Sequence, residues 1–157
     1  WGSLGCTRVH GRRVFRSTMV LVAERTVEFS MVDLANIAYY PRIFDLAHRF
    51  FESVWDDVCG QSYPHLINER RIGFPVVSVD ASFLSPLRYG DQITANITFT
   101  KIGSTSLGWR YRFLNQGGVE VWTSTQTTVC VNMDTMEPMP IPEDLRRGLE
   151  PHLEAPV

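Results

Sequence analysis

The chain has 157 residues, of which 44% are hydrophobic and 20% charged, and this length and balance are typical of one globular domain. Three scattered cysteines exclude a disulfide framework, and the longest apolar stretches fall far short of the ~18 residues that a membrane-spanning helix needs. A formal net charge of −2 gives no electrostatic basis for binding nucleic acid or an anionic membrane. We therefore expect a cytoplasmic protein that binds neither.

The first 18 residues differ in composition from the rest of the chain. They hold four arginines, and no acidic residue occurs before Glu24. This is not the composition of a core, so we expect residues 1–18 to be a basic N-terminal extension that is flexible or processed. Residues 19–157 then form a single folded domain, which begins with a strand rich in Val and Thr over Val20–Phe29.

A long helix with a wide apolar face is predicted next. Apolar residues recur at helical spacing from Ile43 to Val58. Pro41 suits the first turn of this helix, where a missing N–H has no cost, and Gly60 suits the left-handed residue that ends a helix after Cys59. The helix is therefore expected to span residues 41–59 and to be mostly buried.

Strands dominate the second half of the chain. After a polar loop at Gln61–Arg71, two of the strand-like runs alternate apolar and polar residues, which indicates one buried and one solvent-facing side. The turn at Asn115–Gly118 predicts a hairpin, so we expect these strands to pair antiparallel as a meander. The predicted strands and a short closing helix are Phe74–Leu84, Asp91–Ile102, Ser106–Leu114, Val119–Met133 and Glu143–Leu149. One long helix must then pack across the sheet, which is an α+β fold.

An irregular segment, Ser30–Tyr40, separates the first strand from the helix and carries one carboxylate, Asp33. The first turn of a helix presents unpaired backbone N–H groups and the positive end of the helix dipole. Such donors stabilise an oxyanion at an acyl carbonyl, and a carboxylate beside them supplies a base or a nucleophile, so both requirements of acyl transfer are met. From the local pattern alone, the other interpretation is that Asp33 only stabilises a turn.

Several separated blocks of the chain follow a recognisable order. The first block consists of Phe29, Asp33, Ala35, Ile37, Tyr40 and Pro41. The next two consist of Gly73, Pro75, Val77, Ser78, Ala81, Ser82 and Phe83, and of Pro86–Asp91. Together they resemble the 4-hydroxybenzoyl-CoA thioesterase family of hotdog-fold enzymes, with Asp33 at the position of that family's essential aspartate. The likeness extends from about Val27 to Leu149.

This resemblance implies a hotdog fold, in which an antiparallel sheet wraps around one long central helix. It also implies hydrolysis of a small aromatic or short to medium acyl-CoA. Asp33 would be the nucleophile or general base, and the backbone N–H of Tyr40 would polarise the thioester carbonyl. Coenzyme A is then part of the substrate, and no metal or separate cofactor is needed. The residues expected to contact the substrate are Asn36, Tyr39, Pro41, Phe74 and Pro75.

Enzymes of that family are oligomers with an acyl pocket shared between subunits, so the resemblance implies a homo-oligomer, either a dimer or a homotetramer. Phe74 and Pro75 of a neighbouring subunit would then line the site opposite Asp33. The strand pattern agrees, because an open sheet has an edge to bury and a homodimer with a continuous sheet would bury it.

Three positions depart from the family pattern, and one of them is Met31, which replaces a second acidic residue found in some members two positions before the catalytic one. Asn36 stands where the family often has Gly, and we expect it to adopt the left-handed conformation, which Asn enters more readily than most residues. The turn Gly103–Thr105 lies where the closest enzymes carry a basic cluster for the CoA phosphates. The remaining candidates for phosphate recognition are backbone N–H groups and the side chains of Arg88, Lys101, Ser104, Thr105 and Arg110. The alternative is that an acyl carrier protein, not free CoA, delivers the acyl group.

Other chemistry is less well supported by the sequence. Glu52 and His48 lie on the predicted helix and are interpreted as solvated or interfacial residues. The four histidines are too far apart for a metal site, and a hydratase is disfavoured because no histidine precedes the helix after His10. A non-catalytic module that binds acyl-CoA stays open, since a fold does not fix a function.

Overall fold

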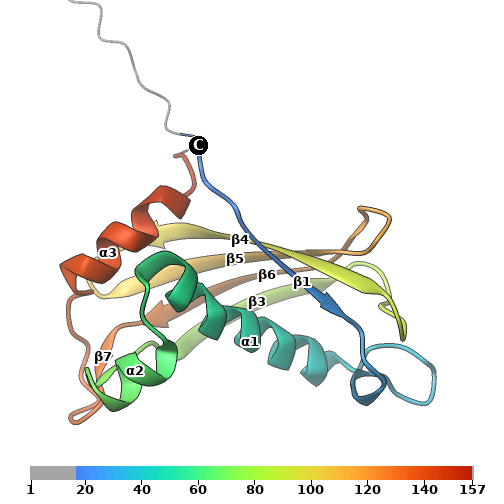
Figure 1. The fold of residues 1–157 in the computed structure, drawn as a ribbon, viewed down its shortest axis with the longest axis horizontal. Coiled ribbons are helices and arrows are strands. Elements are labelled where there is room, and N and C mark those ends of the chain that lie inside the picture. Colours follow the sequence, from blue (N-terminus) through green and yellow to red (C-terminus); the bar gives the residue numbers. More distant parts are fainter. Residues whose placement is uncertain (1–16, 157) are drawn as a thin grey trace, which may run out of the picture.

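The computed structural model describes residues 17–156, in which a five-stranded antiparallel sheet lies against one long helix (Figure 1). The predicted N-terminal extension, residues 1–18, falls almost entirely outside the described residues. The helices are α1 (Tyr40–Cys59), α2 (Tyr63–Asn68) and α3 (Glu143–Leu149), with 3-10 turns at Phe29–Met31 and Glu150–His152. The strands are β1 (Leu21–Thr26), β2 (Ile72–Gly73), β3 (Val76–Phe83), β4 (Gln92–Ile102), β5 (Ser106–Leu114), β6 (Glu120–Val129) and β7 (Val131–Asn132). No helix among residues 17–156 is both long and apolar enough to cross a membrane.

Helix α1 forms the centre of the core, and its bounds match the prediction to within one residue. Gly60 ends it in the left-handed conformation, with φ of 63°, and donates its N–H to Asp56 O at 3.0 Å. The buried side chains of the helix are Ile43, Leu46, Ala47, Phe50, Phe51, Val54 and Trp55. The Trp55 ring is fully buried, 4.4 Å from the ring of Phe74 and 5.9 Å from that of Trp109. Burial of such large aromatic side chains holds the helix across the sheet.

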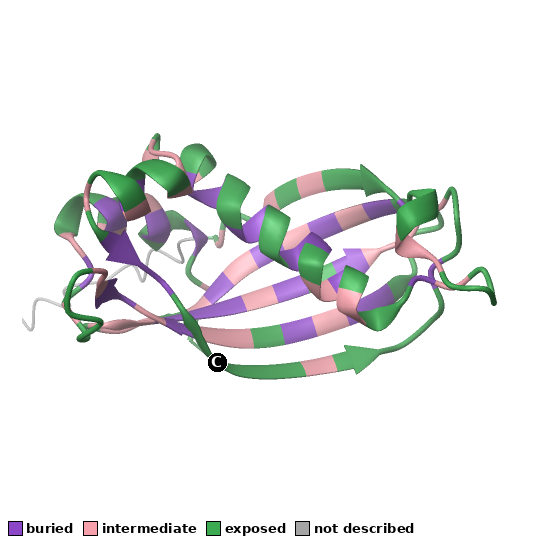
Figure 2. Cartoon of the chain, turned by 90° about the horizontal axis from the view of Figure 1, so that it is seen from below, coloured by how far each residue is buried: buried purple, intermediate pink, exposed green. Residues whose placement is uncertain are grey.

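The large sheet has the order β1-β4-β5-β6-β3, and its inner and edge strands differ in burial (Figure 2). Along β4 and β5, apolar side chains face α1 and alternate with polar ones on the opposite face, as the sequence predicts. In contrast, nearly all of β3 is exposed, including Val77, Val79 and Phe83. The sheet therefore has an uncovered, apolar edge strand.

Three details differ from the sequence-based expectations. Strand β3 does not continue the meander into β4 but pairs with β6 at the far edge of the sheet. Residues 61–71 are not a simple loop, because the Ser62 side chain accepts the N–H of His65 and starts the short helix α2, which buries Leu66. The predicted strand Val119–Met133 is divided into β6 and β7 at Cys130.

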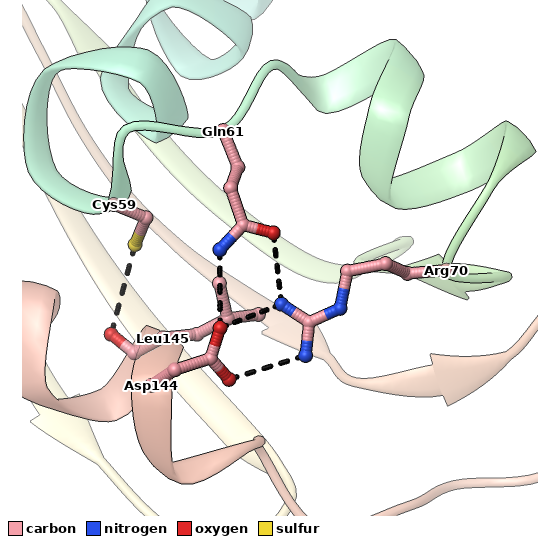
Figure 3. Close-up of polar contacts among 5 residues, drawn as sticks. All are labelled: Cys59, Gln61, Arg70, Asp144 and Leu145. Atoms are coloured by element: carbon pink, nitrogen blue, oxygen red, sulfur yellow. Dashed lines mark hydrogen bonds and ion pairs between the residues drawn. The ribbon is translucent and has the colours of Figure 1, made fainter.

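A hydrogen-bonded cluster fastens α3 to the segment that follows α1 (Figure 3). Arg70 donates two bonds to the Asp144 carboxylate, at 2.7 and 3.1 Å, and Gln61 bonds to both of these side chains. Nearby, the Cys59 Sγ lies 3.7 Å from Leu145 O, and burial raises the pKa of this thiol to about 11. Hydrogen bonds from Arg70 lower the pKa of Asp144 from 3.8 to about 2.

This ion pair predicts a pH-dependent contribution to stability. Since the pKa of Asp144 is lower in the folded protein, its contribution is complete above pH ~4 and is lost as the pH falls towards 2. Both partners are partly exposed, so we expect Asp144→Asn to lower the free energy of unfolding by only about 1 kcal/mol at pH 7. Urea titrations should show that the difference in free energy of unfolding between the wild type and Asp144→Asn is smaller below pH 3 than at pH 7. Asp134→Asn, which removes the more exposed pair with Arg71, is the control and should change stability less.

Candidate active site

The Asp33 side chain is held at the surface by a tight loop. A bridge between Val32 and Ala38 closes the loop, and Asp33 N donates to Ile37 O at 3.0 Å. Asn36 occupies the left-handed region with φ of 58°, as predicted for the position where the family often has Gly. The Asp33 Oδ1 accepts N–H groups from Ala35 at 2.8 Å and Ile37 at 3.4 Å. Its Oδ2 has no hydrogen-bond partner among residues 17–156, so the aspartate stabilises the turn with one oxygen and exposes the other.

The start of α1 supplies one free backbone donor. Tyr39 is the residue before the helix and makes no side-chain cap, Pro41 has no N–H, and Arg42 N donates to Tyr39 O at 2.8 Å. The N–H of Tyr40 is left without an acceptor in the part of the chain that the structure describes. A free N–H at the positive end of a 20-residue helix favours a partially negative oxygen.

Two hydrogen bonds fix the loop relative to its surroundings. Tyr39 N donates to Met31 O at 2.8 Å, and Ala38 N donates to Leu87 O at 2.7 Å. The second bond ties the loop to the turn that precedes β4. Beside it lies an open hollow of about 210 Å³ with mostly apolar walls, formed by Ile37, Ala38, Ile43, Phe83, Leu84, Ser85, Pro86 and Leu87. An apolar group can therefore lie next to the Asp33 loop and the end of β3.

The predicted substrate-contacting residues fall into two groups. The first group lies at the start of α1 and consists of Asn36, Tyr39, Tyr40 and Pro41. The rings of Tyr39 and Tyr40 are exposed, with 5.3 Å between their centres. Phe74 and Pro75 instead stand before β3, at its opposite end from the Asp33 loop.

Phe74 and Pro75 also differ from each other in exposure. Phe74 is only 1% exposed, packs on Trp55 and donates its N–H to the hydroxyl of Tyr63 at 3.1 Å. Pro75 is exposed. Phe74 thus belongs to the core of its own chain, and of these two residues only Pro75 is presented at the surface.

The candidate phosphate-binding residues do not gather around Asp33 within one chain. Arg88 lies in the turn that is bonded to the Asp33 loop. Lys101, Ser104 and Thr105 are at the other end of β4, whose 11 residues extend over about 35 Å. Arg110 is on the outer face of the sheet, where its Nε lies 2.6 Å from the Glu154 carboxylate.

Helix α3 brings an additional arginine, Arg146, to the turn between β4 and β5, and no local pattern in the sequence predicts it. Arg146 donates from Nη2 to Gly103 O at 2.7 Å, and Arg147 follows it on an exposed position. Arg146 is 43 residues away from Gly103 in the chain, so only the tertiary structure brings it to this turn. Residues 17–156 contain no group of three or more His, Cys, Asp or Glu side chains that could hold a metal ion.

An antiparallel sheet wrapped around one helix, with a carboxylate loop at the start of that helix, defines the chain as a hotdog-fold thioester hydrolase. Residues 27–149 match the model of the Thioesterase-like superfamily, and the chain belongs to this family. The predicted fold class and the predicted class of enzyme, an acyl-CoA thioesterase, are thereby confirmed.

Individual relatives are distant but cover most of the chain. A 1,4-dihydroxy-2-naphthoyl-CoA hydrolase from Crocosphaera subtropica is 27% identical over 110 residues, which are 70% of this chain and 80% of that protein. A thioesterase superfamily structure from Jannaschia has a TM-score of 0.81 at 25% identity, covering 89% of this chain and 97% of the other. A 4-hydroxybenzoyl-CoA thioesterase variant, crystallised with 4-hydroxybenzoyl-CoA, has a TM-score of 0.76 at 20% identity. The match covers 83% of this chain and 98% of that one.

Proposed function

We propose that the protein hydrolyses an aromatic acyl thioester of coenzyme A to the free acid and the thiol. The observation that carries this proposal is that one loop, which leads into α1, has both a free carboxylate oxygen on Asp33 and the unpartnered N–H of Tyr40. The names of two relatives, one acting on a dihydroxynaphthoyl-CoA and one on 4-hydroxybenzoyl-CoA, favour an aromatic over a straight-chain acyl group.

In the proposed reaction, the thioester carbonyl oxygen accepts the Tyr40 N–H and is polarised by the end of the helix dipole. The Asp33 Oδ2 then attacks the carbonyl carbon, and the C–S bond breaks as the thiolate leaves. The mixed anhydride that results is hydrolysed by water. In the alternative, Asp33 takes a proton from a water molecule that attacks the same carbon. The two routes share the same residues, and the geometry of the free site is compatible with each.

Coenzyme A is the carrier we favour over an acyl carrier protein. The nucleotide phosphates of CoA need cationic or N–H donors, and Lys101 and Arg146 would supply them around the β4–β5 turn. This group is far from Asp33 within one chain, so a CoA molecule that reaches both must bridge two subunits.

A homodimer formed through β3 would meet that requirement. Strand β3 is an exposed apolar edge, which is typical of a strand that pairs with another chain. If two copies of β3 pair antiparallel about a two-fold axis, the partner's Pro75 lies beside Phe83, at the end of β3 that adjoins the hollow next to the Asp33 loop. In each chain the Thr105 carbonyl accepts the N–H of Cys130, next to the residue that bonds to Pro75. The partner's Thr105 would therefore lie near the same end of β3 as the partner's Pro75. A homotetramer would contain two such dimers.

Release of the thiol from a panel of acyl-CoAs tests the proposal. We expect the highest kcat/KM with benzoyl- or hydroxybenzoyl-CoA and lower values with straight-chain substrates, measured with a colorimetric thiol reagent. No release from any member, by a folded oligomer, would contradict the proposal. If the same protein still bound acyl-CoA tightly in calorimetry, the non-catalytic binding module would take its place.

A further inference from the structure

We propose that a small hollow beside the start of α1 is a binding site for a phosphate group. The hollow lies between the end of β1 and the first turns of α1, two segments that come close together in Figure 1. Its volume is about 60 Å³, far below the roughly 300 Å³ of a site for a drug-sized ligand, so it suits a small group. The residues that line it include three arginines and two hydroxyl side chains: Arg25, Thr26, Glu28, Ser30, Met31, Arg42, Asp45, Leu46 and Arg49.

The arginines come from two elements on either side of the hollow. In β1, Arg25 pairs with Ile93 of β4, and the Ile93 side chain is buried on the side of the sheet that faces α1. Directly opposed residues of neighbouring strands point to the same face, so Arg25 also points towards α1. On α1, Arg42 and Arg49 are seven residues apart, which puts them on one side of the helix, about 10 Å from each other along its axis. A strand and a helix thus contribute arginines to one space.

Two of the three arginines lack an acidic partner. Arg49 lies 3.4 Å from the Asp45 carboxylate, whereas Arg25 and Arg42 form no ion pair among residues 17–156. Glu28 also lines the hollow, but it is not close enough to pair with either of them. When the Arg49–Asp45 pair is counted as neutral, two positive charges and one negative charge remain. The hollow therefore has a net positive charge, and two of its guanidinium groups have no carboxylate to bind.

A phosphate group is the ligand that matches these donors. Guanidinium groups bind phosphate oxygens through parallel, charge-assisted N–H bonds, which are among the strongest hydrogen bonds in proteins. The Ser30 hydroxyl adds a third donor, because it makes no hydrogen bond with residues 17–156, whereas the Thr26 hydroxyl is bonded to Gln92 at 3.0 Å. A phosphate group presents three strong acceptor oxygens, one for each of these donors, and a carboxylate presents only two.

The hollow adjoins the Asp33 loop without sharing its chemistry. Met31 lines the hollow, and its carbonyl accepts the N–H of Tyr39 at 2.8 Å. Two sources supply a phosphate group at this position. One is inorganic phosphate, and the other, which rests on the proposed function, is a phosphate of coenzyme A.

Titration with inorganic phosphate at constant ionic strength, followed by calorimetry, tests the site. We expect Arg25→Gln and Arg42→Gln each to weaken binding at least about 10-fold, because each removes charge-assisted bonds. Glu28→Gln should instead tighten binding roughly 5-fold, since it removes the opposing charge. Arg147→Gln is the control, because it removes the same charge from an exposed position of α3 and should leave the affinity unchanged.

Two results would overturn the site. One is the absence of phosphate binding tighter than about 10 mM in the wild type, and the other is an equal affinity in the wild type, Arg25→Gln and Arg42→Gln. Circular dichroism of each variant checks that a weaker affinity does not reflect loss of the fold.

A second titration, with CoA and 3′-dephospho-CoA, identifies the source of the phosphate group. If CoA binds more tightly and Arg42→Gln abolishes the difference, the phosphate belongs to the substrate. If the two bind equally, or if Arg42→Gln keeps the difference, the ligand of the site is free phosphate. Both titrations measure binding alone, so failure of the proposed hydrolysis would not decide either of them.

Discussion

Asp33→Asn should reduce turnover of the best acyl-CoA substrate by at least about 10²-fold while the protein stays folded. The substitution preserves size and an oxygen that can accept the N–H groups of Ala35 and Ile37, so the loop should keep its shape. An amide, however, neither attacks a carbonyl nor takes a proton from water. Thiol release under single-turnover conditions measures the chemical step directly, and circular dichroism with gel filtration checks the fold and the oligomer.

Asp91→Asn is the matched control for this experiment. Asp91 also accepts a backbone N–H in a turn, that of Arg88 at 2.8 Å, but its carboxylate has no assigned chemical role. If Asp33→Asn and Asp91→Asn lost activity equally, Asp33 would be a turn residue and not the reacting group. If Asp33→Asn bound substrate as tightly as the wild type and did not turn it over, the carboxylate would act on the reaction itself.

The parts of the fold that were predicted are those that depend on neighbours in the sequence. Pro41 and Gly60 mark the ends of α1 chemically, and the apolar period between them is helical. The partner of β3 was not predictable in the same way, because its pairing with β6 joins residues that are 39 to 52 positions apart in the chain. Helix α2 was missed because its six residues contain one proline and bury only Leu66. Such a short segment shows no helical period of apolar residues.

The candidate site shows the same division. Asp33 and Tyr40 were identified together because only six residues of one loop separate them in the chain. Arg146 was not identified, since its bond to Gly103 depends on where α3 packs. Of the residues expected to bind the phosphates of CoA, Lys101, Ser104 and Thr105 lie at the other end of β4 from the Asp33 loop, and only Arg88 lies near that loop. This separation requires either two subunits or a different assignment of the phosphate site.

Val79→Lys, on the exposed edge strand β3, should convert the oligomer to monomers and lower activity at least about 10²-fold. Val79 is 49% exposed and pairs with Gln126 on β6, so one side of its strand is free to pair with another chain. A lysine on such an edge opposes strand addition, because the charge would have to be buried. Sedimentation equilibrium measures the oligomer, and thiol release measures the activity of the same samples.

The other edge of the sheet provides the control. Val22→Lys puts the same charge on β1, at a valine that is 62% exposed, and should leave both the β3 pairing and hydrolysis unchanged. A Val79→Lys protein that stayed dimeric and active would remove β3 from the interface. A monomer with full activity would show that Asp33, Tyr40 and the phosphate-binding groups act within one chain. Since Lys101 and Thr105 stand at the far end of β4, that outcome would require Arg88 to hold the phosphates.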